Sequence, residues 1–360
     1  MKQQLIKFFD SLTGKPACKI LPSPPVVMDC PPPASILIIR PGGIGDALLL
    51  SPAIKEIKRC YPNVFLTILA EKRNAGAFSL IPEIDELWQY DSITQMWAAI
   101  RSAPHIVIDT EQWYRLSAVV ARLTGAGRLI GFATNERGRL FTDPIPYNHQ
   151  DYEINSFLNL LIPLKIQLPT ELTIPFLTVP SSAQQEACRL LMPLGNRQLV
   201  TLFPGASIAP RRWGVEKFHQ LAGAINGRNF DVVVIGDKND LKAGKRIVTK
   251  NVSGINLAGQ TTLAQSAAII ERSTLLISGD SGILHMAAGL GVASVSLFGP
   301  GIADKWAPRG RQHIMINKNV PCSPCTKFGY TPKCANHTVC IKQISVTEVF
   351  RAAMRLLPKQ

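Results

Sequence analysis

Residues 35–46 have the sequence SILIIRPGGIGD, and this stretch decides the interpretation of the fold. Residues 36–39 are four consecutive apolar side chains, mostly β-branched, which is typical of a short strand buried on both faces of a sheet. A glycine-rich loop follows at once, and a helical pattern then extends over residues 47–60. The order of strand, glycine loop and helix predicts the first unit of a parallel α/β sheet.

The same alternation continues along the chain and then starts again. In the first half we expect strands at 64–69, 86–90, 105–109 and 128–132, with helices at 93–101 and 113–123. In the second half we expect strands at 199–203, 232–235, 275–278 and 293–298, with helices at 215–225, 241–249, 262–272, 282–290 and 346–357. This pattern predicts two doubly wound, Rossmann-like α/β domains. The predicted parts are an arm (1–34), a first domain (35–175), a second domain (176–345) and a C-terminal helix (346–360).

The composition fits this organisation. The chain has 360 residues, 46% hydrophobic and 18% charged, which is enough apolar material for sizeable cores and excludes general disorder. It has no clean run of about 20 apolar residues, as a membrane span requires, and its start lacks the apolar core of a secretory signal. We therefore expect a cytoplasmic protein whose eight cysteines are reduced.

The positive charge is concentrated in the second half. Residues 1–175 carry 17 Lys and Arg against 16 Asp and Glu, whereas residues 176–360 carry 22 against 9. A basic half favours an anionic partner, such as nucleotide phosphates, an anionic lipid surface or nucleic acid. Charge alone does not choose among them, and a merely soluble basic surface is a further interpretation.

The arm combines an apolar beginning with a proline-rich continuation. Its apolar side chains are Leu5, Ile6, Phe8, Phe9 and Leu12, and lysines accompany them. The prolines between residues 22 and 33 favour extended structure. The arm is interpreted either as a tether packed on the domain surface or as a weak contact with a membrane interface.

In doubly wound sheets, ligands bind at the carboxyl ends of the strands. The first such loop contains Gly43, Gly45 and Asp46. Asp46 has two interpretations: an N-cap of the following helix, or a general base at the mouth of the site. A dinucleotide-binding fingerprint is a weaker alternative, because Leu48 stands at its third glycine position.

Two loops of the second half carry groups suited to a phosphorylated ligand. In residues 278–285, small residues at a helix start expose amides to a phosphate, Asp280 can accept hydrogen bonds from sugar hydroxyls, and His285 lies one helical turn further on. In residues 204–213, Arg211 and Arg212 can pair with a diphosphate. Each loop also has a plain structural interpretation, as a capped turn or a solvated basic turn.

Metal chemistry is weakly indicated. No DxD, HxxxH or HExxH motif occurs, so a divalent ion held by paired carboxylates is not expected. The spacing of Cys322, Cys325, Cys334 and Cys340 would suit a structural zinc ion, although the second half of the cluster lacks a CxxC pair, and a hairpin without metal is the alternative.

Four blocks, in this order, resemble glycosyltransferase family 9, the ADP-heptose:lipopolysaccharide heptosyltransferases. They are ILIIRPGGIGDALLLSPAIKEIKRCYP, LFPGASIAPRRWGVEKF, LAGQTTLAQ and SGDSGILHMAAGLGVASVSLFGP. The resemblance runs from about residue 35 to the C-terminus and leaves the arm outside. It implies a GT-B fold, in which two Rossmann-like domains face each other across a cleft, the first binding the acceptor and the second the nucleotide-sugar.

The resemblance also implies roles for particular residues. Asp46 matches the catalytic aspartate, with Gly43 and Gly45 in the acceptor-side loop. The residues matching donor-binding positions are Ser207, Arg211, Arg212, Asp240, Thr261, Asp280, Ser281, Gly282 and His285. Two of these depart from the usual pattern: Arg211 stands where Lys is usual, and Asp240 where Glu is usual.

The implied activity is an inverting, metal-independent transfer of a sugar, heptose from ADP-heptose, onto a lipopolysaccharide core or related anionic glycolipid at the membrane surface. No cofactor is required for it, and no nucleic acid takes part. The expected location is the cytoplasm, peripheral at the inner face of the inner membrane. The alternatives are a GT-B sugar-nucleotide epimerase, an NAD-dependent oxidoreductase and a non-catalytic nucleotide-binding protein.

Overall fold

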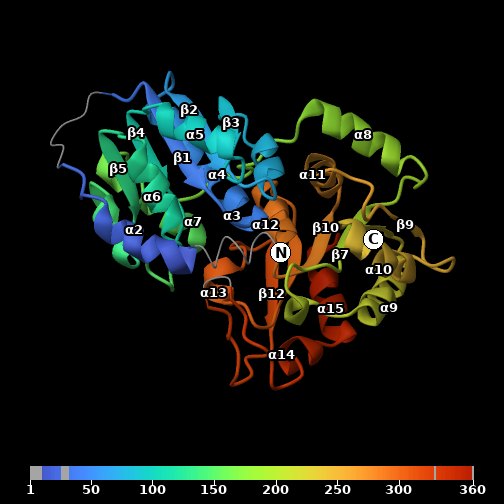
Figure 1. Cartoon of the computed structure of the whole chain (residues 1–360). Coiled ribbons are helices and arrows are strands. Elements are labelled where there is room, and N and C mark those ends of the chain that lie inside the picture. Colours follow the sequence, from blue (N-terminus) through green and yellow to red (C-terminus); the bar gives the residue numbers. More distant parts are fainter. Residues whose placement is uncertain (1–9, 26–31, 328–329, 359–360) are drawn as a thin grey trace. The chain divides into compact units, whose positions relative to one another are not determined.

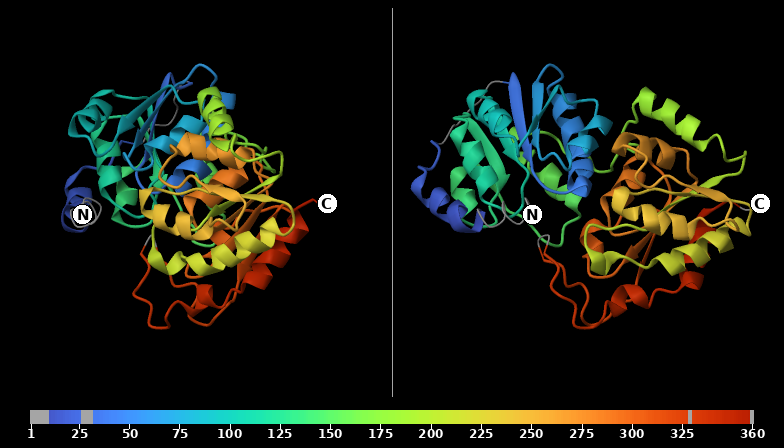
Figure 2. Two further views of the ribbon diagram at one scale, coloured as in Figure 1. Left: turned by 90° about the vertical axis from the view of Figure 1, so that its right-hand side faces the viewer. Right: turned by 45° about the vertical axis from the view of Figure 1, so that its right-hand side comes forward.

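The computed structural model describes residues 10–25, 32–327 and 330–358, so Leu5, Ile6, Phe8 and Phe9 of the arm, and Cys30, lie outside the described residues. The chain divides into two compact units, Met1–Leu172 and Thr173–Gln360. Each unit contains one six-stranded sheet, in which all strand pairs are parallel, with helices on both faces (Figures 1 and 2).

The sheet of the first unit has the strand order β3-β2-β1-β4-β5-β6. Its strands are β1 (Ser35–Arg40), β2 (Phe65–Ala70), β3 (Glu86–Gln89), β4 (Ile106–Asp109), β5 (Arg128–Phe132) and β6 (Asp143–Ile145). The helical segments are η1 (Asp10–Gly14), α2 (Lys15–Ile20), α3 (Ile44–Leu49), α4 (Ser51–Cys60), η2 (Ala75–Leu80), α5 (Ile93–Arg101), α6 (Leu116–Leu123), η3 (Glu136–Leu140), α7 (Glu153–Asn159) and η4 (Ile162–Leu164). As predicted, residues 36–39 of β1 are almost completely buried.

The sheet of the second unit has the order β12-β11-β10-β7-β8-β9. Its strands are β7 (Leu199–Phe203), β8 (Asp231–Val234), β9 (Gly254–Asn256), β10 (Leu275–Gly279), β11 (Ser294–Phe298) and β12 (His313–Asn317). The helical segments are α8 (Ser181–Leu191), η5 (Ala209–Arg211), α9 (Val215–Asn226), η6 (Lys238–Asp240), α10 (Leu241–Ile247), α11 (Leu263–Glu271), α12 (Gly282–Gly289), α13 (Ala303–Trp306), α14 (Val339–Lys342) and α15 (Val346–Leu356).

Counted within its own unit, each sheet has the Rossmann order 3-2-1-4-5-6, which confirms the predicted fold class. The strand order reverses between β1 and β4 in the first unit and between β7 and β10 in the second. The loops after these four strands therefore diverge at the carboxyl edge of each sheet, where ligand sites form in this fold.

The structure differs from the sequence prediction in several elements, and helices such as α7 and α8 were not among the predicted ones. The helix expected over residues 47–60 is two helices, because Pro52 cannot donate to the i−4 carbonyl and instead occupies the first turn of α4. The strands β6, β9 and β12 were not predicted. They lie at sheet edges, where one side is free of a neighbouring strand and a continuous apolar run is not needed.

The described part of the arm is packed onto the first unit. The helix α2 contacts α6 and η3, and its Cys18 is fully buried in the core cluster that also contains Leu37 and Val107. Residues 10–20 are thus helical and packed against the first unit.

Candidate active site

Asp46 is the third residue of α3, in the first turn after the loop that follows β1. The N-cap of this helix is Gly43, and no side chain caps it, so the interpretation of Asp46 as the N-cap is wrong. The Asp46 side chain is half-buried. A Cβ atom added at Gly43 would lie 2.9 Å from Asp46 Oδ2, so the glycine provides the space in which this carboxylate sits.

Gln112, on the loop after β4, connects Asp46 to a buried polar network. Its Nε2 atom lies 3.5 Å from Asp46 Oδ1 and donates to Glu153 Oε1 at 2.7 Å. Glu153 is completely buried and also accepts a hydrogen bond from the Tyr147 hydroxyl at 2.8 Å. Burial, followed by the charge of Glu153, raises the pKa of Tyr147, so this hydroxyl remains a donor.

Arg40, at the end of β1, ties the two loops together. Its almost fully buried guanidinium donates to the carbonyls of Pro41 and Thr110, each at 2.7 Å, and to Gln112 Oε1 at 3.3 Å. Gly42 has a φ of 120°, and an added Cβ would lie 2.8 Å from Arg40 Nη2. The loop after β1 is therefore shaped around this arginine.

In the second unit, the loops after β7 and β10 are joined by an ion pair between Arg211 Nη1 and Asp280 Oδ2 at 3.0 Å. Both side chains are mostly buried, Arg211 at 16% and Asp280 at 6% exposure. The Nε atom of Arg211 is buried without a hydrogen-bond partner in the described residues. Burying a donor without a partner is unfavourable, which makes this atom a candidate contact for an anionic ligand.

Arg212 has a different environment. It is exposed, and its Nε and Nη2 atoms donate to the carbonyl of Ala206 at 3.2 and 3.0 Å. These bonds close the loop after β7 on itself, with exposed Ser207 next to the accepting carbonyl.

The start of α12 has a side-chain cap. Ser281 is the N-cap, accepts from the backbone of Leu284 and shares a hydrogen bond with the Ser278 hydroxyl at 2.8 Å. Gly282 opens the helix, and His285 is buried with its ring 6.1 Å from that of Trp306. Trp306 was not predicted as a site residue, although it ends the short helix α13 in the connection that follows β11.

The remaining predicted donor residues lie further along the same edge. The carboxylate of Asp240 is mostly buried and accepts from the backbone of Asp237 at 3.1 Å in a capping box. Burial raises its pKa. The Thr261 hydroxyl is hydrogen-bonded to Ser266 at 2.8 Å. Asp240, in the segment after β8, packs against Gly205 of the loop after β7. The segments that follow these two neighbouring strands are therefore in contact.

The four cysteines of residues 322–340 do not form a metal site in this arrangement. Within residues 10–25, 32–327 and 330–358, no three His, Cys, Asp or Glu side chains are placed to hold a metal ion. Cys322 is exposed, Cys325 and Cys334 are half-buried, and Cys340 is buried. Burial, with smaller contributions from the neighbouring thiols, raises the pKa of Cys325 and of Cys340.

No helix in the described part of the chain is long and apolar enough to span a membrane.

Comparison with known proteins identifies the family. The model of glycosyltransferase family 9 (heptosyltransferase) matches residues 93–335. The chain belongs to glycosyltransferase family 9. It is 24% identical over 312 residues to the lipopolysaccharide heptosyltransferase 2 of Salmonella typhimurium, which covers 78% of this chain and 87% of the relative.

Solved structures of similar proteins have the same fold. That of the E. coli ADP-heptose LPS heptosyltransferase II has a TM-score of 0.74 at 22% identity and covers 89% of this chain and 98% of the other. That of a family 9 glycosyltransferase from Veillonella parvula has a TM-score of 0.75 at 21% identity, with coverages of 92% and 98%. The resemblance and the GT-B fold class are thereby confirmed.

The protein is therefore a glycosyltransferase, as predicted, and the NAD-dependent oxidoreductase is not supported. The dinucleotide-binding fingerprint is also incomplete in the first loop, because its third glycine position is occupied by Leu48, a fully buried core residue.

Proposed function

We propose that this family 9 glycosyltransferase is an inverting, metal-independent heptosyltransferase that moves heptose from ADP-heptose onto a lipopolysaccharide core or a related glycolipid. The description of the family and the relatives named above support this choice of donor and acceptor. The observation that carries the chemistry is Asp46, a half-buried carboxylate that caps no helix and lies beside Gln112 where the strand order reverses.

In the proposed reaction, Asp46 accepts the proton of an acceptor hydroxyl. The hydroxyl oxygen forms a bond to the anomeric carbon of the donor heptose while the bond from that carbon to the diphosphate oxygen breaks. The attack comes from the face opposite the leaving group, so the configuration inverts, and the products are the extended acceptor and ADP. The proton remains on Asp46 until water removes it.

The groups proposed to hold the departing diphosphate lie in the second unit. Asp280 holds the guanidinium of Arg211 in place, and the Nε–H group of Arg211 can then donate to a phosphate oxygen. The amides at Ser281 and Gly282 add partial positive charge at the start of α12. The positive charge of residues 176–360 attracts both the diphosphate and the anionic surface of a membrane, and supports a location at the inner face of the inner membrane.

The test is ADP release from ADP-heptose with and without a heptose-deficient core acceptor, together with NMR of the new glycosidic bond. We expect ADP release only with acceptor, and inversion at the anomeric carbon. Release without acceptor would instead support the epimerase, and donor binding without turnover would support a non-catalytic protein. Asp46→Asn should lower kcat by about 10²- to 10⁴-fold while ADP stabilises the variant as much as the wild type. Normal turnover of this variant would refute the assigned base.

A further inference from the structure

Asp10, in the arm that lies outside the resemblance to the family, caps a helix more than a hundred residues away. Its Oδ1 atom accepts hydrogen bonds from the backbone amides of Arg115 and Leu116, at 2.6 and 2.7 Å. Leu116 is the first residue of α6, and Arg115, its N-cap residue, supplies no capping side chain. Asp10 is only 3% exposed, so it fills the role that an N-cap side chain would have had.

The arm is fitted closely to this point. A Cβ added at Gly14 would lie 2.9 Å from the Cβ of Arg115 and 3.2 Å from Asp10 Oδ1, so no larger residue fits between the segments. Lys15 and Arg115 both pair with Glu136, at 3.3 and 2.7 Å. A segment that was only a tether would not need such a close contact.

Asp10 caps the start of α6. The short loop that ends there begins after β4 and contains Gln112. The loop begins at the end of β4, where buried Arg137 pairs with Asp109 and donates to the carbonyl of Glu111. Within the loop, the amides of Trp113 and Tyr114 donate to Glu111 Oε1 at 3.0 and 3.3 Å. One end is thus held by the sheet and the other by Asp10, with Gln112 and its contact to Asp46 in between.

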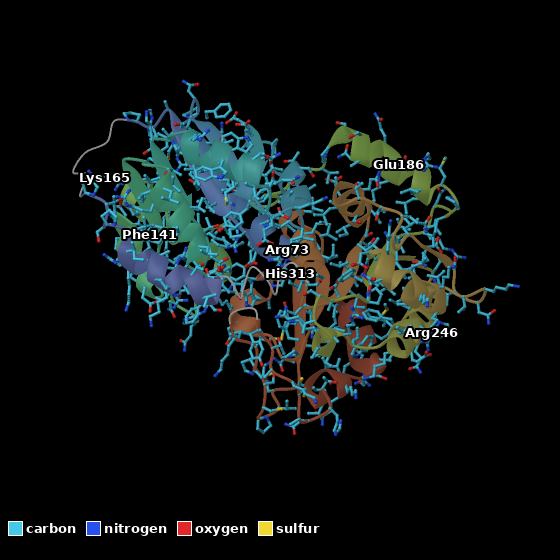
Figure 3. The ribbon with its side chains drawn as sticks, viewed as in Figure 1. Arg73, Phe141, Lys165, Glu186, Arg246 and His313 are labelled. Atoms are coloured by element: carbon cyan, nitrogen blue, oxygen red, sulfur yellow. The ribbon has the colours of Figure 1, made fainter. Side chains whose placement is uncertain are left out.

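The same carboxylate borders a pocket at the carboxyl ends of β1, β2, β3 and β4. The pocket has an empty volume of about 490 Å³, open solvent included, and its lining includes Asp10, Glu71, Arg73, Tyr90, Tyr114 and Leu116. Arg73, labelled in Figure 3, pairs with Glu71. Release of Asp10 from α6 would therefore alter both the loop and a wall of this pocket.

We propose that Asp10 is a positioning residue of the acceptor side: by capping α6 it holds residues 110–115, and through them Gln112, against Asp46. This inference rests on the proposed role of Asp46. Loss of this cap would let Gln112 move away from Asp46. A base that is no longer held in position takes the proton of the acceptor hydroxyl less efficiently.

The experiment compares Asp10→Ala, Asp10→Asn and Gly14→Ala with Cys18→Ala as control. Asparagine keeps the Oδ1 acceptor, and Gly14→Ala pushes the segment from Arg115 while retaining the carboxylate. Cys18→Ala loosens the buried face of α2 without touching the cap. The measurements are kcat and KM for the core acceptor, determined separately, ADP binding, and hydrogen exchange of residues 110–116.

We expect Asp10→Ala to lower acceptor kcat/KM about tenfold and to speed exchange across residues 111–116. Gly14→Ala should do the same to a smaller extent, Asp10→Asn should resemble wild type, and ADP affinity should not change in any variant. Equal effects in Asp10→Ala and Cys18→Ala, or faster exchange confined to residues 115 and 116, would overturn the proposal. If wild type fails to transfer heptose at all, the proposed function falls, while the exchange measurement still decides whether Asp10 positions the loop.

Discussion

Replacement of Gly43 by serine should separate the stability of the protein from its activity. Gly43 is the N-cap of α3, with φ −81° and ψ 157°, the extended conformation that N-cap residues adopt. Serine fits this backbone, and its hydroxyl can accept from an amide of the first turn. We therefore expect no loss of stability, and a gain of up to about 1 kcal/mol in the free energy of unfolding.

The new Cβ, however, would lie 2.9 Å from Asp46 Oδ2, whereas ordinary contacts begin at 3.4 Å. The carboxylate must therefore move by at least 0.5 Å, the difference between these two distances. A misplacement of about 1 Å can cost about 10²-fold in rate, so half of that distance corresponds to about a tenfold loss of kcat.

The assay is acceptor-dependent ADP release together with urea unfolding of the same preparation. The double variant with Asp46→Asn supplies the control, because its side chain is an amide and no catalytic carboxylate is left to be displaced. Gly43→Ser should then have no further effect on kcat. Wild-type kcat in Gly43→Ser, or a full tenfold loss in the Asp46→Asn background, would show that the glycine does not serve Asp46.

Three further outcomes are expected. Arg211→Met should abolish most of the thermal stabilisation by ADP. Arg211→Lys should keep part of it, because lysine retains the charge but not the Nε donor. An equal rise in melting temperature with ADP in both variants and in the wild type would show that Arg211 is not part of the donor site. Burial lowers the pKa of His313 from 6.5 to about 4, so the unfolded chain binds more protons than the folded one between these pH values. The free energy of unfolding should therefore fall as the pH falls from about 6.5 to about 4. In urea unfolding, His313→Gln should show a smaller fall across that range, and an unchanged pH dependence would contradict the lowered pKa. Elemental analysis should find well under one zinc ion per chain, and a chelator should not change the melting temperature, because the cysteines of residues 322–340 are not gathered around a metal site. One tightly held zinc ion would show that these thiols take up a different arrangement.

Much of the fold could be predicted from the sequence because its central strands are buried on both faces. The apolar runs of β1, β4, β7 and β10 are visible without any structure, and these four strands flank the points where the order reverses. Because ligands bind at the carboxyl ends of such strands, the sequence also predicts candidate sites in the loops after β1, β7 and β10. Edge strands such as β9, with three half-buried residues, carry no comparable signal.

The candidate site was only partly predictable for a related reason. Asp46, Arg211 and Asp280 stand in conspicuous loops, but Gln112 and Glu153 are polar residues without a motif, 41 positions apart, that meet only in the folded unit. A signal for Arg40 did exist, since an arginine that ends a fully apolar strand must find partners as the strand is buried. The role of Asp10 had no signal, because a cap supplied from 105 residues away leaves no local spacing.

The glycines of the two sites have a different use from the one their loops first indicate. A glycine-rich loop after a strand is usually interpreted as room for a phosphate next to the backbone. Here the room is taken by the protein's own carboxylates: Asp46 lies against Gly43, and Asp280 lies so close to Gly301 that a Cβ there would overlap it. A carboxylate lodged against backbone has little freedom to rotate, which is what a base or an arginine partner needs if it is to face its target before the substrate arrives. It follows that substitutions at these glycines should act through the neighbouring aspartate, and that each should lose its effect on rate or binding once that aspartate is replaced.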